Sequence, residues 1–189
     1  MLAGSRSRIP THSILAALGA AALLAMAPGP AAAQPGAAPG SLSPARLSRV
    51  DETMLRDLAR GNLAEVAAGK LALDKAQDAE VKAFAQTMVD DHGAAMKELE
   101  QLAQSKSVKL PTQPTGAQIS MMKGMESLRP GSFDKMYLTQ SGVTDHRKTL
   151  ALLKRMQAKG KDADLKTLAA KMQPTVEQHL QQAVKLAGR

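Results

Sequence analysis

Four long stretches of this chain carry apolar side chains in alternating steps of three and four residues, and this periodicity limits the possible folds more than any other feature. The stretches cover about residues 50–75, 79–105, 133–159 and 163–187. Apolar residues spaced in this way share one face of an α-helix, which can then pack against other helices. No segment alternates with period two over the length of a strand. We therefore predict an all-α domain.

Residues with helix-capping chemistry stand at the starts of these stretches. Ser48, Asp78, Ser132 and Asp162 are the predicted N-caps, because a short side chain with an oxygen atom can accept a hydrogen bond from the first turn of a helix. The predicted inner face of the third helix consists of Met136, Thr139, Val143, His146, Leu150 and Leu153.

The connections between the stretches are unequal in length. Short turns near Gln77 and near 160–162 join the first helix to the second and the third to the fourth, so each pair is predicted to form a hairpin. About 26 residues, 106–132, separate the hairpins, which is long enough to cross a bundle, and a short helix is expected near 117–128. Two hairpins joined by one long crossover are the ferritin-like arrangement. We predict a ferritin-like four-helix bundle over residues 48–189, with the second and third helices parallel.

The two predicted hairpins contain a short internal repeat. Asp78–Met88 (DAEVKAFAQTM) matches Asp162–Met172 (DADLKTLAAKM) in register, with Asp, Ala, Lys and Met at equivalent positions. This similarity suggests that the hairpins descend from one duplicated pair of helices.

The N-terminal segment has the features of a cleavable signal peptide over residues 1–33. Arg6 and Arg8 precede an uncharged run at 14–26 that is too short to span a bilayer comfortably, and small residues at 31–33 suit cleavage before Gln34. Residues 34–47 are a Pro/Gly-rich linker. We predict a periplasmic protein, with outer-membrane association or an uncleaved anchor as alternatives. The chain has no Cys, which excludes a lipoprotein and disulfides.

The charge of the chain is basic but dispersed. The formal net charge is +8, yet segments such as 97–106 (KELEQLAQSK) mix both signs. Nucleic-acid binding is disfavoured by the predicted export and by the scarcity of aromatic residues for base stacking. A peripheral contact with anionic lipids of the envelope stays open, and the sequence specifies neither a protein partner nor an oligomeric state.

The three histidines beyond the predicted signal peptide share one local pattern. His92, His146 and His179 each follow a Val by three residues and precede a Leu by seven, near the middle of the second, third and fourth helices. At the matching depth the first helix carries Asn62 and Glu65. The pattern predicts one central layer with three imidazoles and a carboxylate or amide.

Such a layer has two interpretations. Neutral imidazoles and carboxylates bind Zn, Fe, Mn or Cu, and Asp91 and Asp145 flank the stripe where they could orient a ligand on a neighbouring helix. The candidate metal site therefore comprises His92, His146, His179, Glu65, Asp91 and Asp145. Alternatively, the histidines are core residues that pair with one another, with Asn62 or with buried water. Met121, Met122 and Met125 similarly suit either a soft Cu(I) site or, more often, the apolar face of a crossover helix.

Several segments resemble a known bacterial family. GNLAEVAAGKLAL at 61–73, VKAFAQTMVDDH at 81–92, FDKMYL at 133–138 with its following DH, and QPTVEQHL at 173–180 carry the resemblance, which spans residues 51–189. The family comprises exported ferritin-like proteins with a domain of unknown function, often called outer-membrane or periplasmic proteins. The resemblance implies a ferritin-like fold and export, and it implies no reaction.

Iron ferritins differ from this chain at their ligands. Their Glu-x-x-His pairs would require Glu at 89, 143 and 176, where this chain has Val. A ferroxidase centre is therefore disfavoured. The sequence favours a non-catalytic binding or stress-associated envelope protein, with metal binding at the histidine layer as an option. The alternative is a metal-dependent oxidase or peroxidase.

Overall fold

The computed structural model describes residues 46–189, and these residues are helical, without a strand. The predicted signal peptide at 1–33 and residues 34–45 of the predicted linker lie outside the described residues. Among the described helices, none combines the length and the apolar character that a membrane span requires. The all-α prediction is thus confirmed for residues 46–189.

The first hairpin consists of α1 (Arg49–Lys75) and α2 (Ala79–Ser105). The side chain of Ser48 accepts a hydrogen bond from the first turn of α1, and Asp78 does the same for α2. The second hairpin joins α5 (His146–Lys159) to α6 (Ala163–Ala187), which Asp162 caps. These caps satisfy N–H groups that have no partner within the helix.

The crossover contains the short helix α3 (Gly116–Glu126), as the sequence predicted. Thr115 and Gln118 form a reciprocal capping box at its start. The next helix, α4 (Pro130–Tyr137), begins earlier than predicted, with Arg129 rather than Ser132 at the cap. Proline suits this position because the first turn needs no backbone donor there.

A π-helical segment, η1 (Leu138–Asp145), joins α4 to α5 without a break. The inner face of this stretch is buried as predicted from His146 to Leu153, but its first part was predicted wrongly. Met136 and Thr139 are exposed, whereas Phe133, Tyr137 and Ser141 are buried. A π-turn spans five residues rather than four. The buried face therefore moves by about one residue before it returns to His146.

Each hairpin turn is held by an aspartate from the other pair of helices. Asp51, in the first turn of α1, accepts from the backbone N–H groups of Lys161 and Asp162 at 3.1–3.2 Å. Asp134, in the first turn of α4, accepts from Gln77 and Asp78 at 3.0–3.3 Å. This reciprocity agrees with the internal repeat, in which Asp78 and Asp162 are equivalent.

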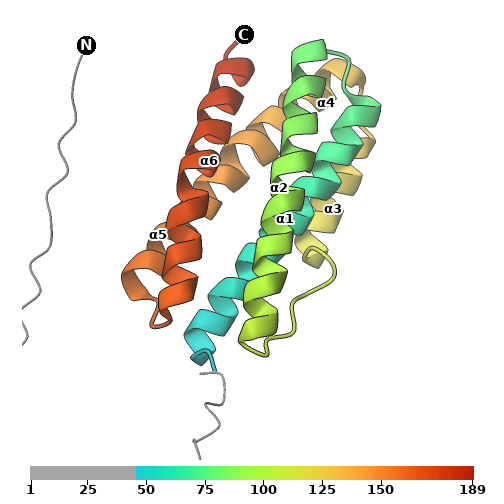
Figure 1. Ribbon diagram of the computed structural model, residues 1–189. Helices are drawn as coiled ribbons and strands as arrows, with labels where there is room; N and C mark the ends of the chain where they lie inside the picture. The colour runs from blue at the N-terminus through green and yellow to red at the C-terminus, as the bar shows by residue number, and fades with distance from the viewer. Residues whose placement is uncertain (1–45) are drawn as a thin grey trace, which may run out of the picture. The chain divides into compact units, whose positions relative to one another are not determined.

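The same contacts define the direction of the helices. The start of α2 lies beside Asp134 of α4, and Lys106 after the end of α2 pairs with Asp162 after the end of α5. Consequently α2 and the α4–α5 stretch run in the same direction, as predicted (Figure 1). Two hairpins joined by a crossover position four long helical stretches around a shared interior.

The core consists of two apolar clusters. One contains buried residues such as Leu55, Leu99 and Leu153, and the other contains Ala72, Phe84 and Tyr137. Along each long helical stretch, buried polar residues separate the part in one cluster from the part in the other. These residues are Asn62, Glu65, His92, Ser141, His146 and His179. The predicted central histidine layer is therefore a polar belt between two apolar clusters.

Candidate metal centre

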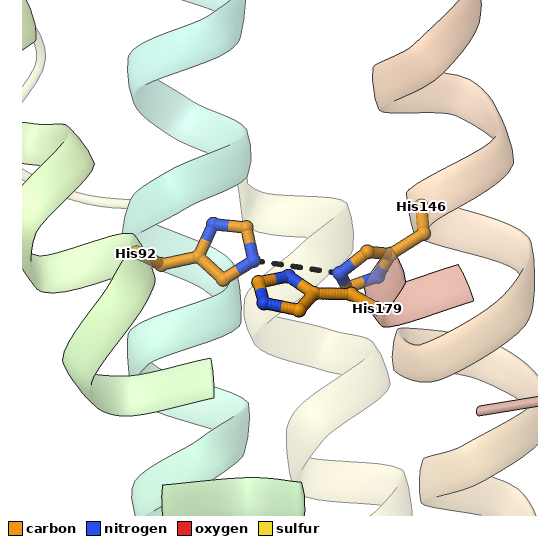
Figure 2. A group of neighbouring side chains, drawn as sticks. All are labelled: His92, His146 and His179. Atoms are coloured by element: carbon orange, nitrogen blue, oxygen red, sulfur yellow. Dashed lines mark hydrogen bonds between the residues drawn. The ribbon is translucent and has the colours of Figure 1, made fainter. Parts of the chain in front are cut away.

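Three histidine rings from α2, α5 and α6 meet in this belt. His92, His146 and His179 are 4%, 1% and 2% exposed, and each pair of ring centroids is 5.4 Å apart. One nitrogen of each ring lies within 4.8 Å of the others. Figure 2 shows the rings turned toward a common point, with Nε2 of His92 and Nε2 of His146 at 3.4 Å. The predicted convergence of the histidines is present.

The outer nitrogen of His92 has a defined partner. Nδ1 lies 2.8 Å from Oδ1 of Asn62, whose amide nitrogen donates to the carbonyl of Leu58 at 2.8 Å. Because the amide nitrogen is committed to Leu58, Oδ1 is the acceptor toward His92. Nδ1 of His92 therefore carries the proton, and Nε2 presents a lone pair to the other rings.

The other two rings are arranged in the same way. Nδ1 of His146 donates to the Ser141 carbonyl at 2.8 Å, and Nε2 of His179 donates to Oδ2 of Asp91 at 2.9 Å. A carbonyl and a carboxylate can only accept, so the remaining nitrogens, Nε2 of His146 and Nδ1 of His179, are unprotonated. Nδ1 of His179 is buried and has no hydrogen-bond partner in residues 46–189.

All three rings are held in the neutral form. Burial lowers the pKa of His92 well below its usual value, with the neighbouring rings adding to the effect. Burial lowers the pKa of His146 to about 4 and also lowers that of His179. At neutral pH three lone pairs thus face one another with no proton between them. The three lone pairs repel one another, and a cation placed between them would relieve this repulsion.

The distance between two of the three nitrogens fits a transition-metal ion, and the third nitrogen lies within 4.8 Å of them. Two imidazole nitrogens bound to one tetrahedral metal at about 2.0–2.1 Å lie about 3.3 Å apart, close to the 3.4 Å between His92 and His146. The outer partners are an amide, a backbone carbonyl and a carboxylate, the groups that commonly orient metal-bound histidines. Neutral imidazoles suit Zn, Cu, Fe and Ni.

The three acidic candidates lie outside the convergent nitrogens. Asp91 contacts the outer side of His179, as predicted for an orienting residue. Oε1 of Glu65 lies 3.6 Å from Nδ1 of His146, behind that ring, and burial raises the pKa of Glu65 well above its usual value. Asp145 bonds to Gln140 and Lys148 instead.

Ser141 is the contributor that sequence reasoning missed. Its carbonyl meets the ring five residues later only because η1 has a π-helical turn. Ser141 and the adjacent Gly142 are poor helix formers. Their position in the middle of a predicted helix is the feature of the sequence that indicates an irregular turn there.

Two cavities reach the polar belt from opposite sides. One, of about 180 Å³, lies between α2 and α6 and is lined by Asp91, His92 and His179. The other, of about 160 Å³, is lined by Glu65 of α1, Ser141 of η1 and the methionines of α3. The histidine cluster is therefore adjacent to space that a small solute can enter.

Fold and site together define residues 46–189 as an all-helical unit with a buried layer of three neutral imidazoles. The chain belongs to the DUF4142 family, a domain of unknown function whose profile matches residues 36–186. No curated protein sequence matches it. The predicted membership in a family with a domain of unknown function is confirmed, whereas the ferritin-like classification and export stay predictions.

Solved structures share the fold. A DUF305 fragment from Deinococcus radiodurans matches with a TM-score of 0.68 and 11% identity, covering 77% of this chain and 99% of that chain. CopM in its Cu(I)-bound form matches with a TM-score of 0.60 and 14% identity, covering 71% and 93%. CopM in its Cu(II)-bound form matches with a TM-score of 0.59 and 12% identity, covering 73% and 95%. At these identities the similarity concerns the fold alone.

Proposed function

We propose that this protein is an exported, non-catalytic metal-binding protein that holds one transition-metal ion on His92, His146 and His179. The observation that carries the proposal is that one nitrogen from each of three buried rings lies within 4.8 Å of the others. Each outer nitrogen already donates to Asn62, Ser141 or Asp91. These outer hydrogen bonds can therefore stay in place when a metal binds, while the inner nitrogens, which lie within 4.8 Å of one another, move closer together.

Copper is the first metal to test, followed by Zn, Fe(II) and Mn. CopM, which has a similar fold, was solved with Cu(I) and with Cu(II). Imidazole donors suit both copper and zinc, and a given site generally binds Cu(II) more tightly than Zn(II). The proposal also includes export to the periplasm, which the signal-peptide pattern of residues 1–33 supports. It includes a ferritin-like arrangement as well, which the two hairpins and their single crossover support.

Thermal melts of the exported, purified protein test metal binding. A metal that binds only the folded state adds about 2.7 kcal/mol at a hundred times its Kd, which should raise the Tm by roughly 5 °C or more. The His146→Ala variant should lose this shift, whereas Arg147→Ala, an exposed neighbour, should keep it. If no metal raises the Tm, or if metal raises the Tm of His146→Ala by as much as that of the wild type, the histidines form a packing layer only.

The cavity between α2 and α6 favours one second candidate, a metal-dependent oxidase or peroxidase. A three-nitrogen set leaves a fourth tetrahedral position free, and the cavity lined by His92 and His179 gives a small oxidant a route toward it. Consumption of hydrogen peroxide by the Cu- or Fe-loaded protein, lost in His146→Ala, would support this candidate. Turnover equal to that of free metal would reject it.

A further inference from the structure

The cavity on the other side of the polar belt has three methionines in its wall. Met121, Met122 and Met125 of α3 line it, and their spacing places them on one face of that short helix. Their exposure falls along this face: Met121 is 43% exposed, Met122 is half-buried and Met125 is 2% exposed. The thioethers therefore extend from the surface into the interior.

The facing wall combines alanines of α1 with polar residues, and one of these has an unpaired oxygen. Glu65 and Ser141 line the same cavity, and both are 4% exposed. Oε2 of Glu65 is buried and has no hydrogen-bond partner in the described residues. Because a buried polar atom without a partner is destabilising, this oxygen marks a place where a ligand would be bound.

Packing explains only part of this arrangement. Met125 and Met122 pack in the apolar cluster that contains Ala68, as expected of the apolar face of a covering helix. Beside them, however, about 160 Å³ stays open, and the lining of this space includes Glu65 and Ser141. Thioether sulfur prefers soft cations such as Cu(I), and an adjacent carboxyl group balances the charge of such an ion once it has released its proton.

We propose that this cavity is a second metal site, which takes a soft monovalent cation, Cu(I), on the sulfurs of Met122 and Met125 with Glu65 beside them. The site is distinct from the histidine cluster. Glu65 stands on the Nδ1 side of His146, whereas Nε2 of His146 faces the other histidines. The two sites therefore lie on opposite sides of one ring.

Ag(I), a redox-inert probe for Cu(I), tests this site in protein with ¹³C-labelled methionine methyl groups. We expect the methyl signals of Met122 and Met125 to shift and saturate at the first equivalents, with assignments from Met122→Leu and Met125→Leu. The double variant should bind Ag(I) at least about tenfold more weakly, because coordinating sulfurs are lost. Leu conserves volume, so the fold should be kept; Met156→Leu, buried in the other core cluster, is the matched control.

The histidine variant separates this proposal from the proposed function. In His146→Ala the methionine shifts should persist even though the stabilisation by metal at the histidine cluster is lost. The second site is rejected if Ag(I) moves no methionine signal or only that of exposed Met121, if the double variant binds like wild type, or if His146→Ala abolishes the methionine shifts. A protein that shows methionine shifts but no histidine-dependent stabilisation would retain this site and lose the proposed function.

Discussion

Asp91 on α2 accepts a hydrogen bond from Nε2 of His179 on α6 at 2.9 Å. The aspartate side chain is 43% exposed, whereas the ring is almost fully buried. An accessible carboxylate on one helix thus determines which nitrogen of a buried ring on another helix is unprotonated. The tautomer of His179, and with it the third lone pair of the cluster, depends on this contact.

Replacing Asp91 with Ala should weaken metal binding by about 10–100-fold, the usual effect of removing an orienting partner of a metal-bound histidine. Competition with a chromogenic chelator would measure the affinity. Asp90→Ala is the control, because Asp90 is exposed and, within residues 46–189, its side chain bonds only to Gln86 of its own helix. Equal affinities in both variants would show that Asp91 does not orient the site.

Acidification should destabilise the fold between about pH 6.5 and pH 4. A histidine of the unfolded chain titrates near pH 6.5, whereas burial lowers the pKa of His146 to about 4. The unfolded state therefore binds more protons in this interval, and the stability present above pH 6.5 is lost as the pH falls. Glu65 acts in the opposite sense, because burial raises its pKa and the folded state binds its proton more tightly.

Chemical denaturation across this pH range, in wild type and His146→Gln, would isolate the contribution of His146. The loss of unfolding free energy from pH 7 to pH 4 should be smaller in the variant by up to about 3 kcal/mol. Parallel pH profiles would indicate that His146 is not held neutral by the fold.

Removing the aspartate that holds the second hairpin turn should be costly. Asp51 is 1% exposed and bonds to two backbone N–H groups, so Asp51→Ala should lower the unfolding free energy by about 2–3 kcal/mol. Asp134→Ala removes the equivalent bonds at a half-buried site and should cost less. Urea denaturation measures both; a larger loss for Asp134→Ala would contradict the role of burial.

Gly142 permits the close approach of η1 to α6. A Cβ at this position would lie 2.7 Å from Cβ of Ala183, so Gly142→Ala should destabilise the protein by about 1–3 kcal/mol. Ala183→Gly in the same chain should restore part of the loss. Gly124→Ala on α3, where a Cβ meets nothing within 4 Å, should be neutral or slightly stabilising. Thermal melts give the Tm of each variant. Equal Tm values for Gly142→Ala and Gly124→Ala would refute the close contact.

The sequence predicted much of the fold because its signals are local. The bounds of α1, α2 and α6 follow from apolar periodicity and from capping residues such as Asp78 and Asp162, which act within one helical turn. The shared depth of His92, His146 and His179 was also readable, since it depends on counting along helices of similar length. The start of α4 and the buried face of Met136 and Thr139 were predicted wrongly.

What the sequence by itself determined is the helical periodicity, the hairpin connections and the placement of three histidines at one depth. Only the tertiary structure decided which ring nitrogens converge, because each tautomer depends on a partner that the fold brings to the ring, such as Asn62 for His92 and Asp91 for His179. It also decided the π-turn of η1, which aligns the Ser141 carbonyl with His146. These features depend on contacts between helices, and no pattern within a single helix encodes such contacts.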